Sequence, residues 1–330
     1  MQRLSIVITN YNYDKYVGAA IDSALAVRWP DLEVIVVDDG STDGSRAIIS
    51  TFGDRVTPVY QENGGQFAAA NTGFAVSSGD VVIFLDSDDM LDPTVAERIA
   101  EVWRPGLTKV QFPMLRVDGD GNSLGSRFPR YTSAPSPEQV RAWMRATGAY
   151  PTPPGSGNAY ARDFLVRLLP VDDRVDRSLD SYTLAAAPLL GDVATVTTPL
   201  VKYRLHGAND SNLRSGPHRF GIELARAYRR HLYALDVSGN AAEGPRAIFR
   251  GRHLLQLRVA HRRLCPGEQP IPNDSRRRMV WDTVRAPFAP GPEPAWQRVV
   301  VSAWCLVVLV APDFIARRLV RARFAHGGQA

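Results

Sequence analysis

The sequence is poor in cysteine, with only Cys265 and Cys305 among 330 residues. Two cysteines cannot form a disulfide framework, and their spacing is not that of a metal site, so we expect a reducing, cytoplasmic compartment. Long apolar runs are also missing at the start of the chain, where MQRLSIVITNYN has an apolar run of only five residues before Asn10. We therefore expect neither a signal peptide nor a membrane-spanning helix there. Glycine (26) and proline (24) stay at ordinary levels, which excludes a collagen-like or wholly disordered chain.

Lysine is scarce as well, because 36 of the 39 basic residues are arginine. The charges are unevenly placed: residues 1–215 carry a net charge of −6 and residues 216–330 a net charge of +11. We expect two domains that divide at about this point. The basic second part favours an anionic surface as its partner, and arginines that are simply solvated are the alternative. No recognition motif accompanies the arginines, so we do not expect nucleic acid as a partner.

Short apolar runs alternate with helical patterns near the start of the chain. The runs at Ser5–Thr9, Glu33–Val37 and Val81–Leu85 are typical of strands buried on both faces, and a further strand is expected at 56–60. This alternation predicts an α/β fold whose mostly parallel sheet is flanked by helices on both faces. Ligands of such sheets bind beyond the carboxyl ends of the strands. Polar residues follow each predicted strand end and therefore predict one shared site: Thr9–Asn12, Asp38–Asp43, Glu62–Gly65 and Asp86–Asp89.

The pattern changes after residue 105. We expect strands at 110–117, 124–130 and within 193–203, helices near 138–145, 155–167, 179–190, 218–235 and 245–264, and a proline-rich linker at 286–294. The later helices predict a C-terminal helical extension of the α/β domain.

The acidic run Asp86-Ser87-Asp88-Asp89 follows a predicted buried strand. Carboxylates two residues apart at a strand end can converge on one hard divalent cation that bridges the phosphates of a ligand. A second Asp-x-Asp, at Asp118-Gly119-Asp120, lies in a Gly/Asn turn that most simply closes a hairpin. Position therefore favours Asp86 and Asp88 as a metal site over a structural turn.

The second predicted strand ends in Asp38-Asp39-Gly40-Ser41-Thr42-Asp43. Asp43 is a good cap for the next helix, and Asp39 can accept hydrogen bonds from a base or a ribose, so both interpretations can hold together. Tyr11 follows the first strand, where an aromatic ring could stack on a base. An ordinary core or surface tyrosine is the alternative for Tyr11.

Five segments resemble the family 2 glycosyltransferases of GT-A fold: SIVITNYNY, EVIVVDDGSTDGS, ENGGQFAAANTGF, SSGDVVIFLDSDDML and PLVKYRLHGANDS, in order over residues 3–212. The resemblance implies an inverting transfer of a sugar from a nucleotide-linked donor, with UDP expected, to an acceptor hydroxyl. It implies Mn²⁺ or Mg²⁺ as the metal and a carbohydrate or lipid-linked acceptor. The family often reads Ala-Arg-Asn where this chain has Ala69-Ala70-Asn71, so an arginine that meets the donor is missing here.

The same resemblance assigns the site residues by position. Tyr11, Asp39 and Asp86 are expected to contact the base and ribose of the donor, and Asp88 is expected to bind the metal on the diphosphate. His206 either reaches the metal or diphosphate from a closing loop or bonds to backbone. Gly155–Asn158 either shapes the acceptor pocket or only a turn. The full assignment is donor binding by Thr9, Tyr11, Asp39, Asn63, Gly65, Asn71, Asp86 and Ser87, metal binding by Asp88 and His206, and acceptor binding by Gly157 and Asn158.

An inverting displacement requires a carboxylate that takes the proton of the acceptor hydroxyl. The family usually supplies it as the Asp of a Glu-Asp pair, and the matching position in Ser178-Leu179-Asp180 is Asp180. Leu179 replaces the preceding Glu. The nearby Asp172, Asp173 and Asp176 are the alternatives for the base.

The tail has an apolar run of 13 residues, Val299–Ala311, with only Ser302 polar. As a helix it would reach about 20 Å, which is short of a hydrocarbon core of about 30 Å. Tryptophans and arginines flank the run, so residues 296–324 predict a helix that inserts at an anionic membrane interface on the cytoplasmic side. A helix packed in the core or against a second subunit is the alternative.

The sequence thus predicts a metal-dependent inverting glycosyltransferase, peripheral to a membrane. A nucleotidyltransferase is one rival, although Thr9–Lys15 lacks the Gly-rich basic phosphate loop which that class needs. A nucleotide-sugar-binding inactive homologue is the other rival, because the Glu before Asp180 is missing.

Overall fold

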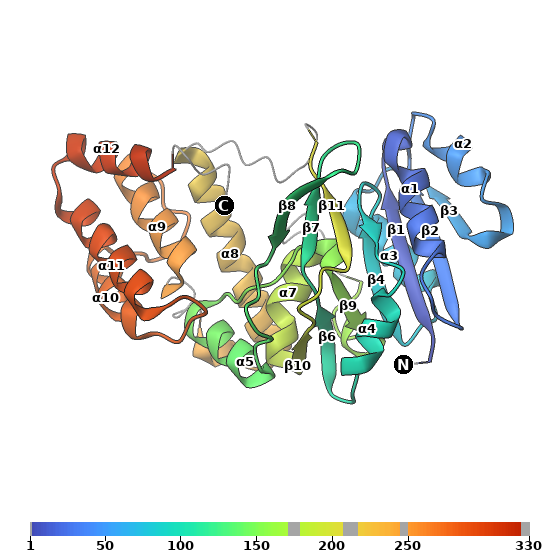
Figure 1. Cartoon of the computed structure of the whole chain (residues 1–330). Helices are drawn as coiled ribbons and strands as arrows, with labels where there is room; N and C mark the ends of the chain where they lie inside the picture. Colours follow the sequence, from blue (N-terminus) through green and yellow to red (C-terminus); the bar gives the residue numbers. More distant parts are fainter. Residues whose placement is uncertain (1, 171–178, 207–216, 245–249, 325–330) are drawn as a thin grey trace. The chain divides into compact units, whose positions relative to one another are not determined.

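The computed structural model of the chain describes residues 2–170, 179–206, 217–244 and 250–324 (Figure 1), without the side chains at 179, 180, 217, 218 and 243. The chain forms two compact units. Unit 1 comprises Met1–Gln139 and Pro151–Gly207, and unit 2 comprises Val140–Tyr150 and Ala208–Ala330. The segment Val140–Tyr150, within the predicted first domain, is thus part of unit 2.

Unit 1 contains a seven-stranded sheet. Its strands, in their order across the sheet, are β10 (Asp192–Thr195), β6 (Leu107–Gln111), β9 (Asn158–Ala161), β4 (Val81–Asp86), β1 (Leu4–Asn10), β2 (Leu32–Asp39) and β3 (Thr57–Gln61). Only β9 is antiparallel to its neighbours among these pairs, so the predicted mostly parallel sheet is confirmed. Thr9 pairs with both Val37 and Asp86, which brings the carboxyl ends of β1, β2 and β4 to one edge.

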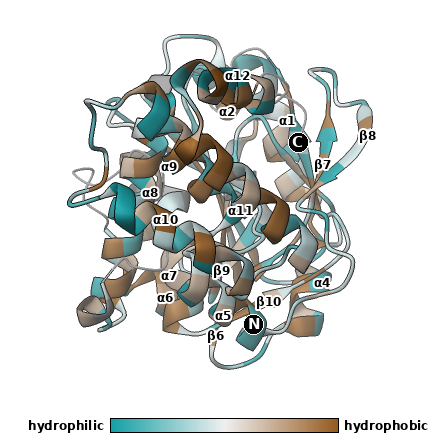
Figure 2. Ribbon diagram, turned by 90° about the vertical axis from the view of Figure 1, so that its left-hand side faces the viewer, coloured by the Kyte–Doolittle hydropathy of each residue, from teal (hydrophilic) through white to brown (hydrophobic). Residues whose placement is uncertain are grey.

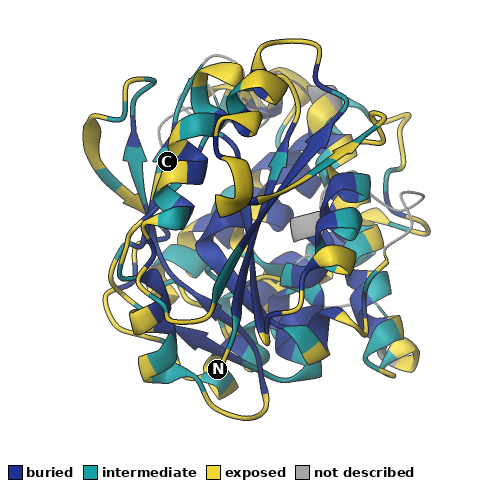
Figure 3. Ribbon diagram, turned by 90° about the vertical axis from the view of Figure 1, so that its right-hand side faces the viewer, coloured by how far each residue is buried: buried dark blue, intermediate teal, exposed yellow. Residues whose placement is uncertain are grey.

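The central strands β1 and β4 are buried because they are apolar on both faces, whereas the edge strand β3 is largely exposed. Leu4, Ile6 and Ile8 are fully buried, and Figure 3 shows dark-blue strands behind helices and loops with yellow exposed residues. The helices of unit 1 are α1 (Asp14–Leu25), α2 (Ser45–Ser50), α3 (Gln66–Val76), α4 (Val95–Val102), α6 (Arg162–Leu165) and α7 (Leu179–Leu190), with a 3-10 turn η1 (Gly53–Arg55). Helix α3 packs closely on the sheet at Gly73, where a Cβ atom would lie 2.2 Å from Cγ1 of Val7.

A second sheet has four strands. In their order across the sheet they are β5 (Met90–Leu91), β11 (Val201–Arg204), β7 (Met114–Val117) and β8 (Ser123–Phe128). The turn at 118–122 closes the β7–β8 hairpin through a bond from the Asp118 N–H to the Asn122 carbonyl (2.9 Å), as predicted. Strand β5 directly follows Asp89 and pairs with β11. The end of β11 is therefore held beside the acidic segment.

Two predictions after residue 105 were wrong. The expected strand at 110–117 is divided at Phe112-Pro113 between β6 and β7, which belong to different sheets; proline cannot donate to a ladder. The expected helix at 155–167 is a 3-10 turn η2 (Gly155–Gly157), strand β9 and the short α6. Strand β9 lies between β4 and β6, so its backbone bonds in the sheet prevail over a helical pattern.

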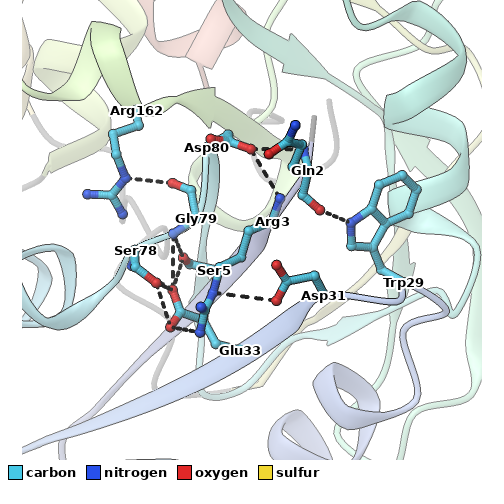
Figure 4. Close-up of polar contacts among 10 residues, drawn as sticks. All are labelled: Gln2, Arg3, Ser5, Trp29, Asp31, Glu33, Ser78, Gly79, Asp80 and Arg162. Carbon is cyan, nitrogen blue, oxygen red and sulfur yellow. Dashed lines mark hydrogen bonds and ion pairs between the residues drawn. The ribbon is translucent and has the colours of Figure 1, made fainter.

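The amino ends of the strands are joined by a polar cluster around Glu33 (Figure 4). The Glu33 carboxylate accepts hydrogen bonds from Ser5 Oγ, from the N–H groups of Ser78 (2.6 Å) and Gly79 (3.1 Å), and from Arg3 (2.9 Å). It therefore ties β1 and β2 to the turn that precedes β4. This cluster lies at the sheet edge opposite the polar strand ends and supports the fold.

Unit 2 is helical. Its helices are α5 (Pro137–Thr147, from residue 140), α8 (Pro217–Val237), α9 (Arg252–Leu264), α10 (Arg276–Arg285), α11 (Ala295–Val310) and α12 (Asp313–Phe324), with 3-10 turns η3 (Ala241–Glu243) and η5 (Ala286–Phe288). The predicted linker at 286–294 therefore begins as a helical turn and connects two helices of one unit. Among the described residues, no helix is both long and apolar enough to cross a bilayer.

Candidate functional site

Three carboxylates gather where β4 ends. One oxygen each of Asp86, Asp88 and Asp89 lies within 4.8 Å of the others. The chain turns there because the Asp89 N–H donates to the Asp86 carbonyl at 3.0 Å. Asp89 is fully buried, and this burial, together with the charges of Asp88 and Asp86, raises the pKa of Asp89 well above its usual value. Such a group of carboxylates is electrostatically costly without a cation.

His206 faces this group from the residues after β11. Its Nε2 lies 2.9 Å from Oδ2 of Asp88, and both side chains are largely buried. The imidazole stacks on Tyr16 (centroids 5.0 Å apart) and meets the edge of Tyr13 (5.7 Å). Two aromatic rings on and before α1 therefore hold the orientation of His206 toward Asp88.

Arg204, the last residue of β11, contacts the same acidic turn, and the sequence did not single it out. Its backbone N–H donates to Oδ1 of Asp89 (3.1 Å), and its guanidinium donates to the carbonyls of Asp88 (2.9 Å) and Gly119 (2.7 Å). The guanidinium also lies 4.8 Å over the Tyr16 ring. Arg204 thus fixes the acidic turn and the β7–β8 hairpin together; its place two residues before His206 was the available signal.

The residues present fit a hard divalent cation. Carboxylate oxygens are the ligands that Mg²⁺ and Mn²⁺ prefer, and a neutral imidazole can complete such a set. Oδ2 of Asp89 is buried and has no hydrogen-bond partner among the described residues. A buried carboxylate oxygen without a partner is unusual, and a bound cation would account for it.

Asp39 organises the neighbouring part of the sheet edge. It is buried and accepts hydrogen bonds from Gln61 Nε2 (2.7 Å) and from the N–H groups of Gly64 (2.9 Å) and Gly65 (2.8 Å). Gly65 precedes α3 with a positive φ of 85°, a backbone conformation that favours glycine. The next residue, Gln66, donates to Oδ1 of Asp86 at 3.2 Å. The start of α3 therefore connects Asp39 with the acidic group.

A cavity of about 520 Å³ opens beside Asp39 at the ends of β2 and β3. Tyr60 contributes an aromatic ring to its lining and is 45% exposed. The Arg46 guanidinium lies over this ring, 5.5 Å from its centroid. Tyr11 does not line this cavity and lies exposed in the loop after β1. The lining residues are Gly40, Ser41, Arg46, Tyr60, Gln61, Glu62 and Asn63.

Asp38, next to Asp39, has a structural role. It is fully buried, and burial opposes its charge, yet hydrogen bonds from Ser41, Arg46 and Asn10 outweigh this and lower the pKa of Asp38. The Arg46 bond is 2.8 Å and the Asn10 bond 3.0 Å. Asp38 thus holds the loops after β1 and β2 together beneath the cavity.

The remaining predicted residues are spread around this edge. Thr9 lies in β1 opposite Asp86, Ser87 is buried inside the acidic turn, and Asn71 is half-buried in α3. Asn63 is exposed and its Oδ1 accepts from the Gly65 N–H at 3.2 Å. Asp180 lies in α7 by its backbone, and its side chain is outside the described residues.

Gly157 and Asn158 are interior residues. The Asn158 side chain is fully buried, accepts from Lys109 Nζ (2.8 Å) and donates to the carbonyls of Pro153, Pro154 and Gly155 (each 3.2 Å). A Cβ at Gly157 would lie 2.5 Å from Pro153, so the glycine permits close packing. These contacts hold both residues in place beside the site, and their role in acceptor binding stays a prediction. Ser156, directly before Gly157, accepts a hydrogen bond from the Asp86 N–H at its Oγ (3.1 Å), a contact that the sequence did not indicate.

The class of protein follows from comparison with known sequences. Residues 5–168 match the profile "Glycosyl transferase family 2". An uncharacterized glycosyltransferase of Nostoc sp. is 34% identical over 241 residues, which cover 68% of this chain and 74% of that protein. The chain therefore belongs to glycosyltransferase family 2 and is a glycosyltransferase, as the motifs predicted. Other curated glycosyltransferases match over shorter stretches, and this chain spans a third or less of their length.

Solved structures support the GT-A fold. S. aureus TarS 1–349 in complex with UDP-GlcNAc superposes with a TM-score of 0.58 at 17% identity, covering 98% of this chain and 92% of that one. The mannosyltransferase PcManGT from Pyrobaculum calidifontis, in complex with GDP-Man and Mn²⁺, gives 0.51 at 16% identity and covers 99% and 88%. At such identities the likeness concerns the fold.

Proposed function

We propose that the protein transfers a sugar from a UDP-sugar to an acceptor hydroxyl of a carbohydrate or lipid-linked glycan, with inversion at the anomeric carbon. One observation carries this proposal: three carboxylates converge at the carboxyl end of β4 and face His206 at 2.9 Å. The neighbours that hold UDP-GlcNAc, or GDP-Man with Mn²⁺, support it by their shared fold.

The nucleoside of the donor would occupy the cavity at the ends of β2 and β3. Tyr60 offers an exposed ring for stacking there, and Arg46 offers a cation near the donor. Asp39 accepts three hydrogen bonds, and its two oxygens have capacity for one more, which a base N–H or a ribose hydroxyl could supply. Because Gly65 and Gln66 connect Asp39 with Asp86, the diphosphate would pass the start of α3 on its way to the acidic group.

Asp86, Asp88 and His206 would hold the divalent cation, Mn²⁺ or Mg²⁺. When bound, this cation would offset the negative charge that develops on the departing diphosphate. Arg204 and Ser156 keep the turn that carries the carboxylates in place through hydrogen bonds to the Asp88 carbonyl and the Asp86 N–H.

Asp180 would be the general base. In a single displacement, the acceptor oxygen forms its bond to the anomeric carbon while the bond to the diphosphate oxygen breaks on the opposite face. The acceptor proton passes to the carboxylate of Asp180, which lies in α7. Helix α7 packs against α3, whose start reaches Asp86 through Gln66.

Thermal unfolding in the presence of UDP, GDP, dTDP and CMP, each with and without Mn²⁺, tests this proposal. We expect a metal-dependent rise in melting temperature with UDP that Asp88→Ala abolishes, because a ligand that binds the folded state stabilises it. Asp120→Asn is the matched control, since Asp120 belongs to the other Asp-x-Asp and is exposed. A folded wild type that responds to no nucleotide would contradict the proposal. Nucleotide binding without any transfer or donor hydrolysis would indicate an inactive homologue.

A further inference from the structure

From Val299 onward helix α11 is apolar except for Ser302, and among the described residues only one side of it is covered. Val301, Cys305, Val308 and Leu309 are at most 5% exposed and belong to the core of unit 2. One face of the apolar run Val299–Ala311 therefore packs in a core, which was the alternative to insertion at a membrane. The opposite face is a stripe at helical spacing: Trp296, Val299, Val300, Ala303, Val307 and Val310.

This stripe is unusually exposed for its composition. Its members Trp296 and Val310 are 64% and 72% exposed. Of the 18 large hydrophobic residues that are exposed in the described chain, ten fall between Trp281 and Ile315. Single exposed apolar residues are ordinary, whereas a contiguous group of this kind marks an interaction surface.

Neighbouring elements continue the apolar surface. Helix α10 and turn η5 pack against α11, and in Figure 2 both α10 and α11 lie toward the viewer, with α11 largely brown. The exposed residues of α10 and η5 again follow helical spacing, at Arg277, Trp281, Val284, Arg285 and Phe288, the last of which is 85% exposed. Phe314, at the start of α12, is 75% exposed.

The charges around this surface are mostly positive. Residues 276–324 contain nine arginines and three acidic residues, and one of these, Asp282, is buried against Arg258. Arg317, Arg318 and Arg321 are exposed on α12, and Arg285 lies over the Trp281 ring at 4.9 Å. Apolar side chains with tryptophans, bordered by arginines, match the boundary between the headgroups and acyl chains of an anionic bilayer.

We propose that the exposed face of α10, η5 and α11, with the start of α12, is a docking surface for an anionic lipid membrane. A second copy of the chain fits less well, because a two-fold contact would bring the same arginine-rich border against itself. Docking through this face requires no spanning helix. It buries the stripe of α11 in the interface and pairs the arginines with lipid headgroups.

Co-sedimentation of the full chain with vesicles tests this surface. We expect binding to vesicles with about 30% phosphatidylglycerol and little binding to pure phosphatidylcholine. The double variant Val300→Gln/Val307→Gln should lower the partition coefficient about tenfold, since both side chains are exposed and lose favourable insertion. Arg317→Gln/Arg318→Gln should weaken binding about fivefold per arginine at low salt. Ile222→Gln, an exposed apolar residue of α8, is the matched control and should bind like the wild type.

Three outcomes would overturn the proposal. The first is a Val300→Gln/Val307→Gln variant that binds vesicles like the wild type, and the second is a folded wild type that binds neither kind of vesicle. The third is a stable dimer in light scattering that this double variant dissociates, which would assign the face to a second copy. Trp296→Phe should also reduce the blue shift of tryptophan fluorescence that vesicles cause. Asp88→Ala should still bind vesicles, so failure of the donor site and failure of this surface can be told apart.

Discussion

Nε2 of His206 lies 2.9 Å from Oδ2 of Asp88, although 118 positions separate the two residues in the chain. The contact forms because β11 pairs with β5, which begins directly after Asp89. The match to family 2 ends at residue 168, so His206 and Arg204 complete the acidic group from beyond the matched segment. The site therefore depends on the last strand of unit 1 as well as on the Asp-x-Asp turn.

His206→Gln should weaken Mn²⁺ binding about tenfold or more and leave the fold intact. The imidazole faces Asp88, and glutamine keeps a polar side chain but cannot reproduce the ring contacts with Tyr16 and Tyr13. Titration with Mn²⁺ in the presence of UDP, followed by calorimetry, measures this change. His253→Gln, whose side chain is 69% exposed in unit 2, is the control. Equal Mn²⁺ affinity in His206→Gln and the wild type would refute a ligand role.

Asp180→Asn should abolish sugar transfer and leave nucleotide binding unchanged. Loss of a general base costs about 10²–10⁴-fold in rate, whereas the proposed donor contacts are made by other residues. Transfer assays and UDP calorimetry on the same preparation separate the two effects. Asp172→Asn and Asp176→Asn serve as controls, and the base would be reassigned if either of them lost activity while Asp180→Asn retained it.

The elements that could be predicted from the sequence are those whose signal lies in consecutive residues. The buried strands β1, β2 and β4 and the acidic turn after β4 were predictable, because continuous apolar runs and the polar residues after them are adjacent in the chain. The family resemblance directed attention to His206. Strand β9 was missed because its four residues are strand only by virtue of β4 and β6 on either side. Ser156 was missed for the same reason, since its contact with Asp86 spans 70 positions.

Glu33→Gln should destabilise the protein by about 2 kcal/mol, because the carboxylate accepts several hydrogen bonds, one of them from a charged arginine. Burial opposes the charge of Glu33, but bonds from Ser5 and Ser78 outweigh it and lower the pKa of Glu33. Its stabilisation is therefore complete above its unfolded pKa of about 4.3 and is lost as the pH falls through the lower folded value. Urea unfolding between pH 3 and 7 should show a smaller acid-induced loss in Glu33→Gln than in the wild type. Asp54→Asn, at an exposed position, should behave like the wild type.

Gly73→Ala should destabilise unit 1 by about 1–3 kcal/mol. The new methyl group would lie 2.2 Å from Cγ1 of Val7 and 3.2 Å from Cγ2 of Val37, so α3 must move away from the sheet. Such a shift would also displace Gln66 from Asp86, and nucleotide affinity should fall with stability. Gly267→Ala has open space around the added atom and is the control for thermal unfolding. Unchanged stability in Gly73→Ala would mean that α3 does not approach the sheet as closely as described.

Arg258→Met should destabilise unit 2 by about 3 kcal/mol or more, because it removes one partner of a buried ionic group. Arg258 is 2% exposed, and its guanidinium joins α9 to Asp274 (2.8 Å) and to the buried Asp282 of α10 (2.8 Å). Without the arginine, the remaining cation beside Asp282 among the described residues is the more distant Arg250, at 3.5 Å. Urea unfolding measures the loss, and Arg285→Met, at an exposed position of α10, is the control.

The coupling between these residues distinguishes a charge effect from a packing effect. If the cost arises from an uncompensated carboxylate, Asp282→Asn should be much less damaging in the Arg258→Met background than in the wild type. Methionine fills part of the volume of arginine, so the double variant should recover a share of the lost stability. Additive losses would instead show that Arg258 acts through the packing of its side chain. Because α10 and α11 form the proposed docking surface, a double variant that regains stability should also regain vesicle binding.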